Sequence, residues 1–135
     1  MKKNKIKIML LLFISLVWGG CSSNYPVDED GLLITGRAQC YVSNFELLGV
    51  DHVSVIQSKT IDTTQCTIKT TLYYGTDLKN LYPQFTLATD AKLDPKITGI
   101  TNFSDTINHK QYTVVSGNRK IRKTYTIYIS VQKPI

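Results

Sequence analysis

The stretch "CTIKTTLYY", residues 66 to 74, alternates apolar and polar side chains with a period of two. Successive side chains of a β-strand point to opposite faces of a sheet, so this period predicts a half-buried strand rather than a helix. On the buried face we expect Cys66, Ile68, Thr70, Leu72 and Tyr74. On the face toward solvent we expect Thr67, Lys69, Thr71 and Tyr73.

A second run, "IRKTYTIYISV" at residues 121 to 131, has the same period. Its threonine, isoleucine and tyrosine content suits a pleated, half-buried surface. The residues expected in the core are Tyr125, Ile127, Ile129 and Val131, whereas Tyr128 would point outward. Shorter strands are expected at residues 41–48, 53–57, 83–88, 96–100 and 111–115.

Turn signals separate these runs. In "VVSGNRKI", residues 114 to 121, Gly117 and Asn118 tolerate the positive φ that a tight hairpin turn needs. Gly49, "YGTD" at 74 to 77 and "LDPK" at 93 to 96 mark further turns. Strands and turns at such intervals predict an all-β fold, a single β-sandwich of about seven strands.

Several core and turn motifs also carry a family resemblance. They are Gly75 to Leu78, Leu81 to Pro83, Asn102 to Ser104, Tyr112 to Val114 and Tyr125 to Ile127. Together they resemble an Ig-like domain of unknown function that is found on Bacteroidetes surface lipoproteins, although Asn102 stands where aspartate is common. The resemblance implies an Ig-like β-sandwich but indicates little about function.

Residues 1–20 resemble the signal peptide of a bacterial lipoprotein. A lysine-rich start precedes an apolar run, Ile8 to Val17, that is too short to span a bilayer. The Gly-Gly-Cys ending resembles a lipobox, with Trp18 where leucine is usual, and implies cleavage before a lipidated Cys21. Two or three acyl chains would anchor the protein stably. The alternatives are an ordinary signal peptide and an uncleaved anchor.

An acidic triplet, Asp28, Glu29 and Asp30, follows Cys21. It resembles the surface-export signal of Bacteroidetes lipoproteins and implies display on the cell surface from the outer membrane. The alternatives are a solvated tether without a sorting role and a protein that faces the periplasm. We expect a leader at 1–20, a lipidated cysteine with a flexible tether at 21–36, and the Ig-like domain at 37–135.

Charge argues against a nucleic-acid partner. The whole chain has a net charge of +6, but four of its sixteen basic residues lie in the leader. Without the leader, twelve basic and ten acidic residues remain, a net charge of +2. Six basic residues follow Asp105 without any acidic one: Lys110, Arg119, Lys120, Arg122, Lys123 and Lys133. They form either a patch for anionic glycan or lipopolysaccharide, or a solvated hairpin tip.

Cys40 and Cys66 would be the remaining cysteines after lipidation of Cys21. Outside the cytoplasm they are candidates for a disulfide, which would add roughly 3.5 kcal/mol of stability in the chain-entropy model. We expect no cofactor and no metal site, because His52 and His109 lack a ligand spacing. No catalytic motif is present in the sequence, and we expect the protein not to be an enzyme.

Tyrosines are the best candidates for binding, because their rings suit both cores and sugar-stacking surfaces. Tyr73, Tyr82 and Tyr128 are candidate glycan-binding residues, and cross-strand pairing on a sheet face is the alternative. Thr63 and Thr106 lie in tripeptides that resemble the Bacteroidetes O-glycosylation motif, a short pattern that also arises by chance.

The sequence therefore predicts a lipid-anchored protein of the cell envelope that acts as a non-catalytic binding or structural accessory. Two alternatives stay open. One is a glycan-binding accessory of a polysaccharide-uptake system, and the other is a fimbrial or envelope assembly subunit that uses a sheet edge. Its partners would be the membrane, through the lipid anchor, and a glycan or another envelope protein.

Overall fold

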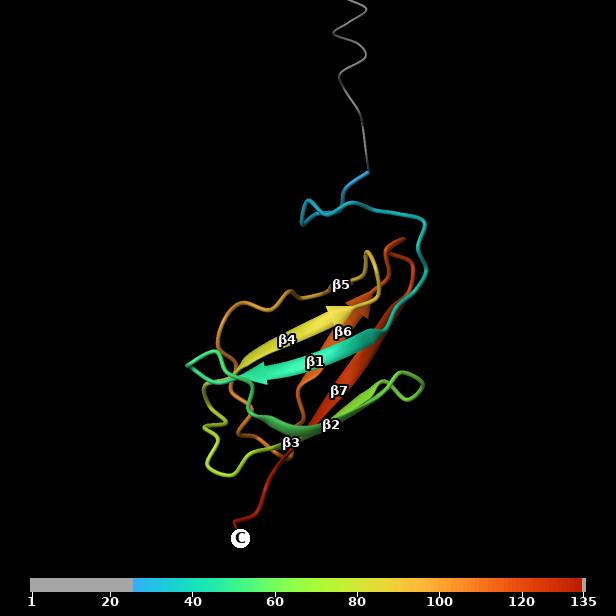
Figure 1. Ribbon diagram of the computed structural model, residues 1–135. Helices are drawn as coiled ribbons and strands as arrows, with labels where there is room; N and C mark the ends of the chain where they lie inside the picture. The colour runs from blue at the N-terminus through green and yellow to red at the C-terminus, as the bar shows by residue number, and fades with distance from the viewer. Residues whose placement is uncertain (1–25, 135) are drawn as a thin grey trace, which may run out of the picture. The chain divides into compact units, whose positions relative to one another are not determined.

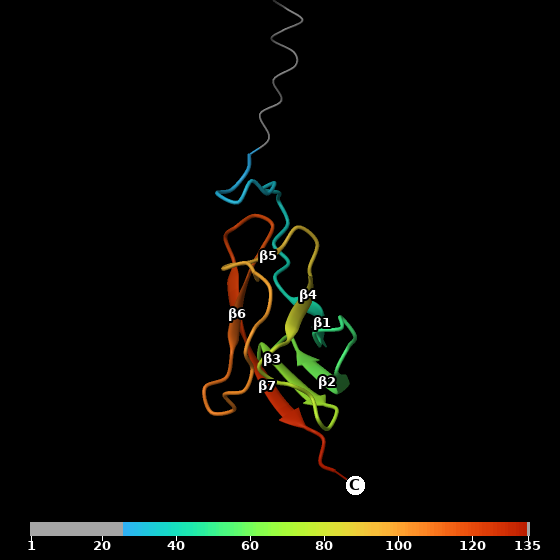
Figure 2. The same ribbon diagram turned by 90° about the vertical axis from the view of Figure 1, so that its left-hand side faces the viewer.

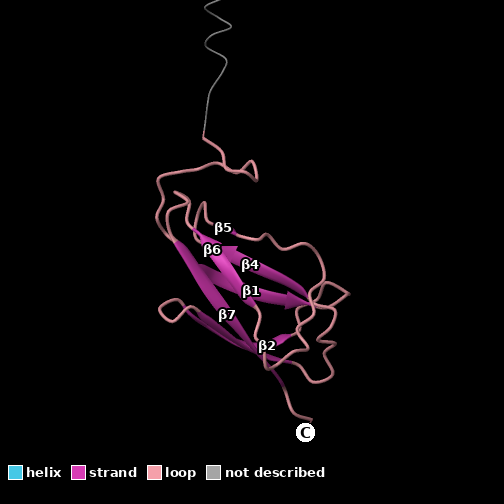
Figure 3. Cartoon of the chain, turned by 180° about the vertical axis from the view of Figure 1, so that it is seen from behind, coloured by secondary structure: helices cyan, strands magenta, loops and turns pink. Residues whose placement is uncertain are grey.

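The structure is a computed structural model that describes residues 26–134. No helix occurs among these residues, and every regular element is a strand (Figure 3). The strands are β1 (Val42–Leu48), β2 (Ile56–Asp62), β3 (Thr67–Leu72), β4 (Tyr82–Leu87), β5 (Lys92–Leu93), β6 (Gln111–Val115) and β7 (Arg122–Val131). The predicted all-β fold is confirmed.

The chain divides into two compact units, Met1–Leu32 and Leu33–Ile135. In the described part of the first unit, Asp28 organises a turn, because its Oδ1 accepts the N–H groups of Asp30 at 3.0 Å and Leu32 at 2.9 Å. All the strands lie in the second unit. That unit includes residues 33–36 of the segment expected to be a tether.

The strands form two sheets that pack as layers. The large sheet has the order β2-β3-β7-β6-β5, and the small sheet pairs β1 with β4 (Figure 1). Figure 2 shows β6 and β7 in one layer and β1 and β4 in the other. Neighbouring strands are antiparallel except for β3 and β7, which run parallel. This arrangement is the β-sandwich that the sequence predicts.

Alternation along β3 and β7 places their apolar side chains between the layers. Ile68, Leu72, Tyr125 and Ile127 are no more than 1% exposed, as expected. The small sheet contributes Phe45 and Leu47 among other buried residues of the same cluster. The core is therefore built from the inward face of each sheet.

The expected alternation fails at strand ends. Cys66 directly precedes β3 with a positive φ of 56°, and Tyr74 lies beyond β3 with 66% of its surface exposed. Strand β3 ends because Thr76 folds back on Tyr73, whose carbonyl accepts both the Thr76 N–H and its hydroxyl. Val131, also expected in the core, is exposed at the end of β7.

Two predicted strands are placed differently. The strand expected at 53–57 is β2, Ile56–Asp62, whose polar residues pair with β3. The strand expected at 96–100 is absent, and only Thr101 forms an isolated bridge, to Leu81. Pro95 lacks a donor for a sheet ladder, and Gly99 has a φ of 78°, so this segment does not stay extended.

The β6–β7 hairpin forms where predicted, but its strained residue differs. Positive φ falls at Arg119, at 61°, and not at Gly117 or Asn118. Gly117 is required for another reason: a Cβ there would lie 2.6 Å from Thr35 Oγ1. Thr35 N–H also donates to Gly117 O at 2.9 Å, so the residues before β1 pack closely on this turn.

Cys40 and Cys66, the candidates for a disulfide, are free thiols in the structure. Cys40 is buried and its Sγ donates to Val114 O at 3.1 Å, whereas Cys66 Sγ approaches Thr63 O at 3.8 Å. Burial raises the pKa of the Cys40 thiol. The two side chains are thus held by separate carbonyl groups.

A polar contact joins β1 to β2 at the edge of the sandwich. Lys59 Nζ donates to Glu46 Oε1 and to Phe45 O at 2.9 Å, and Ser54 Oγ donates to Glu46 Oε2 at 2.8 Å. The hydrogen bonds from Lys59 and then Ser54 hold the pKa of Glu46 below its usual value. The ionised carboxylate therefore favours the folded state.

Glu46→Gln tests this contact through pH. Because the folded-state pKa lies below the unfolded value of about 4.3, Glu46 stabilises the fold above that pH and loses its effect as pH falls through the folded pKa. We expect the variant to unfold about 0.5–1 kcal/mol more easily at pH 7. The difference should vanish at about pH 2, where both side chains are neutral. Urea unfolding at about pH 7 and about pH 2 measures the difference in unfolding free energy. An equal loss of stability at both pH values would contradict a stabilising role for the ionised Glu46 carboxylate.

Candidate functional site

One face of the large sheet turns away from the small sheet and is polar. Alternation that buries Ile68 and Ile127 sends Lys69 and Tyr128 outward, and the parallel register pairs these two residues. We call this surface the polar face and define it by Thr60, Lys69, Thr71, Tyr128 and Ser130. Three adjacent strands, β2, β3 and β7, supply it.

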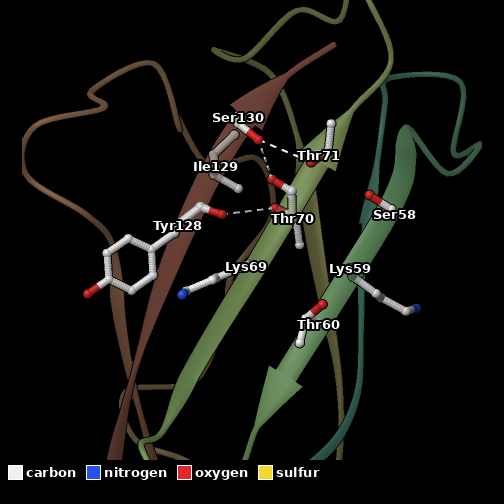
Figure 4. A pocket seen from close by; sticks show the side chains of 9 residues that line it. All are labelled: Ser58, Lys59, Thr60, Lys69, Thr70, Thr71, Tyr128, Ile129 and Ser130. Atoms are coloured by element: carbon white, nitrogen blue, oxygen red, sulfur yellow. Dashed lines mark hydrogen bonds between the residues drawn. The ribbon is translucent and has the colours of Figure 1, made fainter.

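Hydroxyl groups on the polar face are bonded to one another and to the sheet. Thr71 Oγ1 and Ser130 Oγ lie 3.1 Å apart, and Ser130 Oγ donates to Thr70 O at 3.2 Å (Figure 4). Toward the other end of β7, Thr113 Oγ1 and Thr124 Oγ1 lie 2.9 Å apart. These bonds fix the hydroxyl oxygens, which keep acceptor capacity for a ligand.

An open depression of about 260 Å³ lies on this part of the sheet. Figure 4 shows the Lys69 side chain extending from β3 toward β7, which carries Tyr128. The depression is lined by Ser58, Lys59, Thr60, Lys69, Thr70, Thr71, Tyr128, Ile129 and Ser130. It combines hydroxyls, the Tyr128 ring and the Lys69 ammonium, whereas the Lys59 ammonium points away and binds Phe45 O and Glu46.

The Tyr128 ring packs against the His109 ring in a tilted arrangement, with ring centroids 4.4 Å apart and an interplanar angle of 52°. We call these two residues the ring pair. Tyr128 is 37% exposed, so part of its ring remains accessible. The exposed part of the tyrosine ring offers an apolar surface bordered by polar groups, which suits a flat amphipathic ligand.

The loop before β6 holds His109 in place. Asp105 Oδ1 accepts the N–H groups of Ile107 and Asn108, each at 3.0 Å, and Oδ2 accepts Asn108 Nδ2 at 3.1 Å. The bonds from Asn108 and Ile107 lower the pKa of Asp105. A second depression, of about 430 Å³, is lined here by Asn102, Ser104, Asp105, Asn108, His109, Lys110 and Gln111. The two depressions adjoin at the ring pair.

The three tyrosines singled out in the sequence do not form one platform. Tyr128 belongs to the ring pair, whereas Tyr82 starts β4 on the small sheet and packs against His52 in a tilted contact, with ring centroids 4.7 Å apart. Tyr73 follows β3 and is exposed. His109 was not predicted to contact Tyr128, because residues this far apart in the chain meet only through the fold.

Other residues singled out in the sequence lie apart from the polar face or outside the described residues. Cys21 belongs to the part that the structure does not describe. Thr63 and Thr106 are exposed in turns organised by the preceding aspartates, Asp62 and Asp105. Among residues 26–134 no cluster of three or more potential metal ligands occurs. No described helix is long and apolar enough to cross a membrane.

Fold and site together define a small β-sandwich module with an open polar face on one sheet. The chain belongs to the family described as "SGBP, N-terminal", whose model matches residues 50–129, from the β1–β2 loop into β7. This is a family of Bacteroidetes surface proteins. No curated protein sequence matches the chain.

Solved structures from Bacteroides species are similar to this chain. A protein of Bacteroides thetaiotaomicron, provisionally described as a glycoside hydrolase, matches with 25% identity and a TM-score of 0.58 over 82% of this chain and 28% of its own length. A DUF4623 family protein of Bacteroides eggerthii matches with 17% identity and a TM-score of 0.54 over 71% of this chain and 22% of its own. The chain thus spans about a quarter of these proteins, and the second likeness concerns the fold alone.

Proposed function

We propose that this protein is a non-catalytic, glycan-binding accessory of a surface glycan-uptake system, and that it binds glycan on the polar face. The carrying observation is the ring pair, which sets a partly exposed Tyr128 ring beside fixed hydroxyl groups in a protein of the SGBP family. A sugar ring presents an apolar face and a rim of hydroxyls. The Tyr128 ring matches the apolar face, and Thr71 and Ser130 match the rim.

The proposal includes a lipid anchor and surface display. The Gly-Gly-Cys ending of the leader supports acylation of Cys21, and the acidic triplet Asp28, Glu29 and Asp30 supports export to the outer face of the membrane. Glu29 and Asp30 are exposed, as a sorting signal requires. An anchored module would keep captured glycan near the cell surface.

The substitution Tyr128→Ala in the full-length protein tests the glycan site. The change removes the ring on which sugar would stack, and truncation of a central aromatic residue at a binding site weakens affinity by roughly tenfold or more. Affinity electrophoresis in gels that contain one polysaccharide each measures the loss. Tyr74→Ala is the matched control, because Tyr74 is exposed and lies outside the ring pair. If both variants migrate like the wild type in every gel that retards it, the polar face is not the site.

A further inference from the structure

The compact unit that carries the polar face has an excess of positive charge. From Leu33 to Ile135 the sequence has twelve lysines and arginines against seven aspartates and glutamates, a net charge of +5. The three acidic residues of the triplet belong to the other unit. The charge of the sandwich itself is therefore larger than the +2 of the mature chain suggests.

Every carboxylate of this unit has an internal partner. Three of them form ion pairs: Glu46 with Lys59, Asp90 with Arg37 and Asp94 with Arg122. The other four accept backbone N–H groups in turns: Asp51, Asp62, Asp77 and Asp105. These contacts engage all seven carboxylates in bonds within the unit, so the excess charge of the unit is carried by lysine and arginine side chains.

Two of the lysines border the ring pair. Lys69 is the cross-strand neighbour of Tyr128, and its ammonium has no hydrogen-bond or ion-pair partner among the described residues. Lys110 is exposed, follows His109 directly and lines the second depression. Of the residues that line the two depressions, only Asp105 is acidic, and its carboxylate already accepts three hydrogen bonds.

We infer that the polar face recognises an acidic polysaccharide, whose carboxylate or sulfate groups bind the Lys69 ammonium while a sugar ring stacks on Tyr128. This inference rests on the proposed function and adds the chemical class of its ligand. An ammonium donates strong charge-assisted hydrogen bonds to either anion. Lys110 lies in the neighbouring depression and contributes to the attraction of a longer acidic chain.

Polygalacturonate and its methyl ester form the decisive pair of probes, because they share one backbone and differ in charge. We expect the full-length protein to bind polygalacturonate at least about tenfold more tightly than the ester, the effect of one lost charge-assisted bond. Chondroitin sulfate and desulfated chondroitin test sulfate in the same way, because both carry carboxylates and they differ only in sulfate. A preference for polygalacturonate over its ester identifies a carboxylate as the bound anion, a preference for the sulfated chondroitin identifies a sulfate, and either preference supports the inference.

Lys69→Gln should abolish that preference, because it removes the ammonium that binds the anion. Lys120→Gln, at the exposed hairpin tip, is the matched control, because it removes the same charge away from the ring pair. Equal losses in the two variants would overturn a specific role for Lys69. Equal, Tyr128-dependent binding to the two members of each pair would overturn the inference and leave the proposed function standing. Binding to no polysaccharide would overturn both.

Discussion

Tyr125→Ala is expected to leave little folded protein. Tyr125 on β7 is fully buried, and its hydroxyl accepts the N–H of Val42 on β1 at 3.3 Å, so it joins the two sheets. Truncation of a buried aromatic residue costs about 3–5 kcal/mol. The Val42 donor left without a partner adds about 1–3 kcal/mol. That sum approaches the whole stability of a small domain, about 5–15 kcal/mol.

Two further variants separate packing from hydrogen bonding. Tyr125→Phe keeps the ring and removes the hydroxyl, so we expect a loss of about 1–3 kcal/mol. Tyr74→Ala, at an exposed tyrosine, should change stability by no more than about 0.5 kcal/mol. Urea unfolding followed by far-ultraviolet circular dichroism measures all three, because the single tryptophan, Trp18, lies in the expected leader. Wild-type stability of Tyr125→Phe would show that the bond to Val42 does not stabilise the sandwich.

Cys21→Ala is expected to release the protein from the membrane almost completely. Without its thiol, residue 21 cannot receive the diacylglycerol that the Gly-Gly-Cys ending implies. A single acyl chain gives only marginal membrane binding, whereas two or three give stable anchoring, so loss of lipidation should move the protein between fractions. Ultracentrifugation of lysed cells, followed by immunoblotting of membrane and soluble fractions, measures the change.

Cys66→Ala is the control for Cys21→Ala, because it removes a thiol near β3 and leaves the leader intact. A Cys21→Ala protein that stays in the membrane fraction would favour an uncleaved leader as the anchor. Protease shaving of intact cells adds the orientation. Replacement of Asp28, Glu29 and Asp30 by alanine should protect a wild-type-like membrane protein from the protease, and continued cleavage would remove the sorting role of the triplet.

An acidic-glycan site on this sandwich would depend on carboxylates that are bonded within the fold and on a lysine ammonium that is not. The carboxylates near the polar face serve the fold, as Asp105 does for the loop that carries His109. The two lysines near it differ. Lys59 forms an ion pair with Glu46, whereas Lys69 has no ion-pair partner among the described residues. Salt should therefore weaken the proposed binding, since an exposed ammonium is screened within about 8 Å at physiological ionic strength.

Strands were predictable where one face is buried and the other is exposed to solvent. In β3 and β7 the alternation of apolar and polar residues marks which face meets the core, and these strands appear where expected. Strand β2 was misplaced, because the polar run Ser58 to Thr60 pairs through its backbone with β3 and needs no alternation. The segment 96–100 carries strand-forming residues without a partner strand, and only Thr101 bridges to Leu81.

The sequence by itself determined the all-β class, the outward direction of Lys69 and Tyr128, and the hairpin before β7, because each follows from neighbours along the chain. Only the tertiary structure decided which of these residues meet. The parallel register of β3 with β7 sets Lys69 beside Tyr128, and the loop before β6 brings His109 onto the same ring. Such contacts join residues far apart in sequence, and they form because the two sheets must bury their apolar faces against each other.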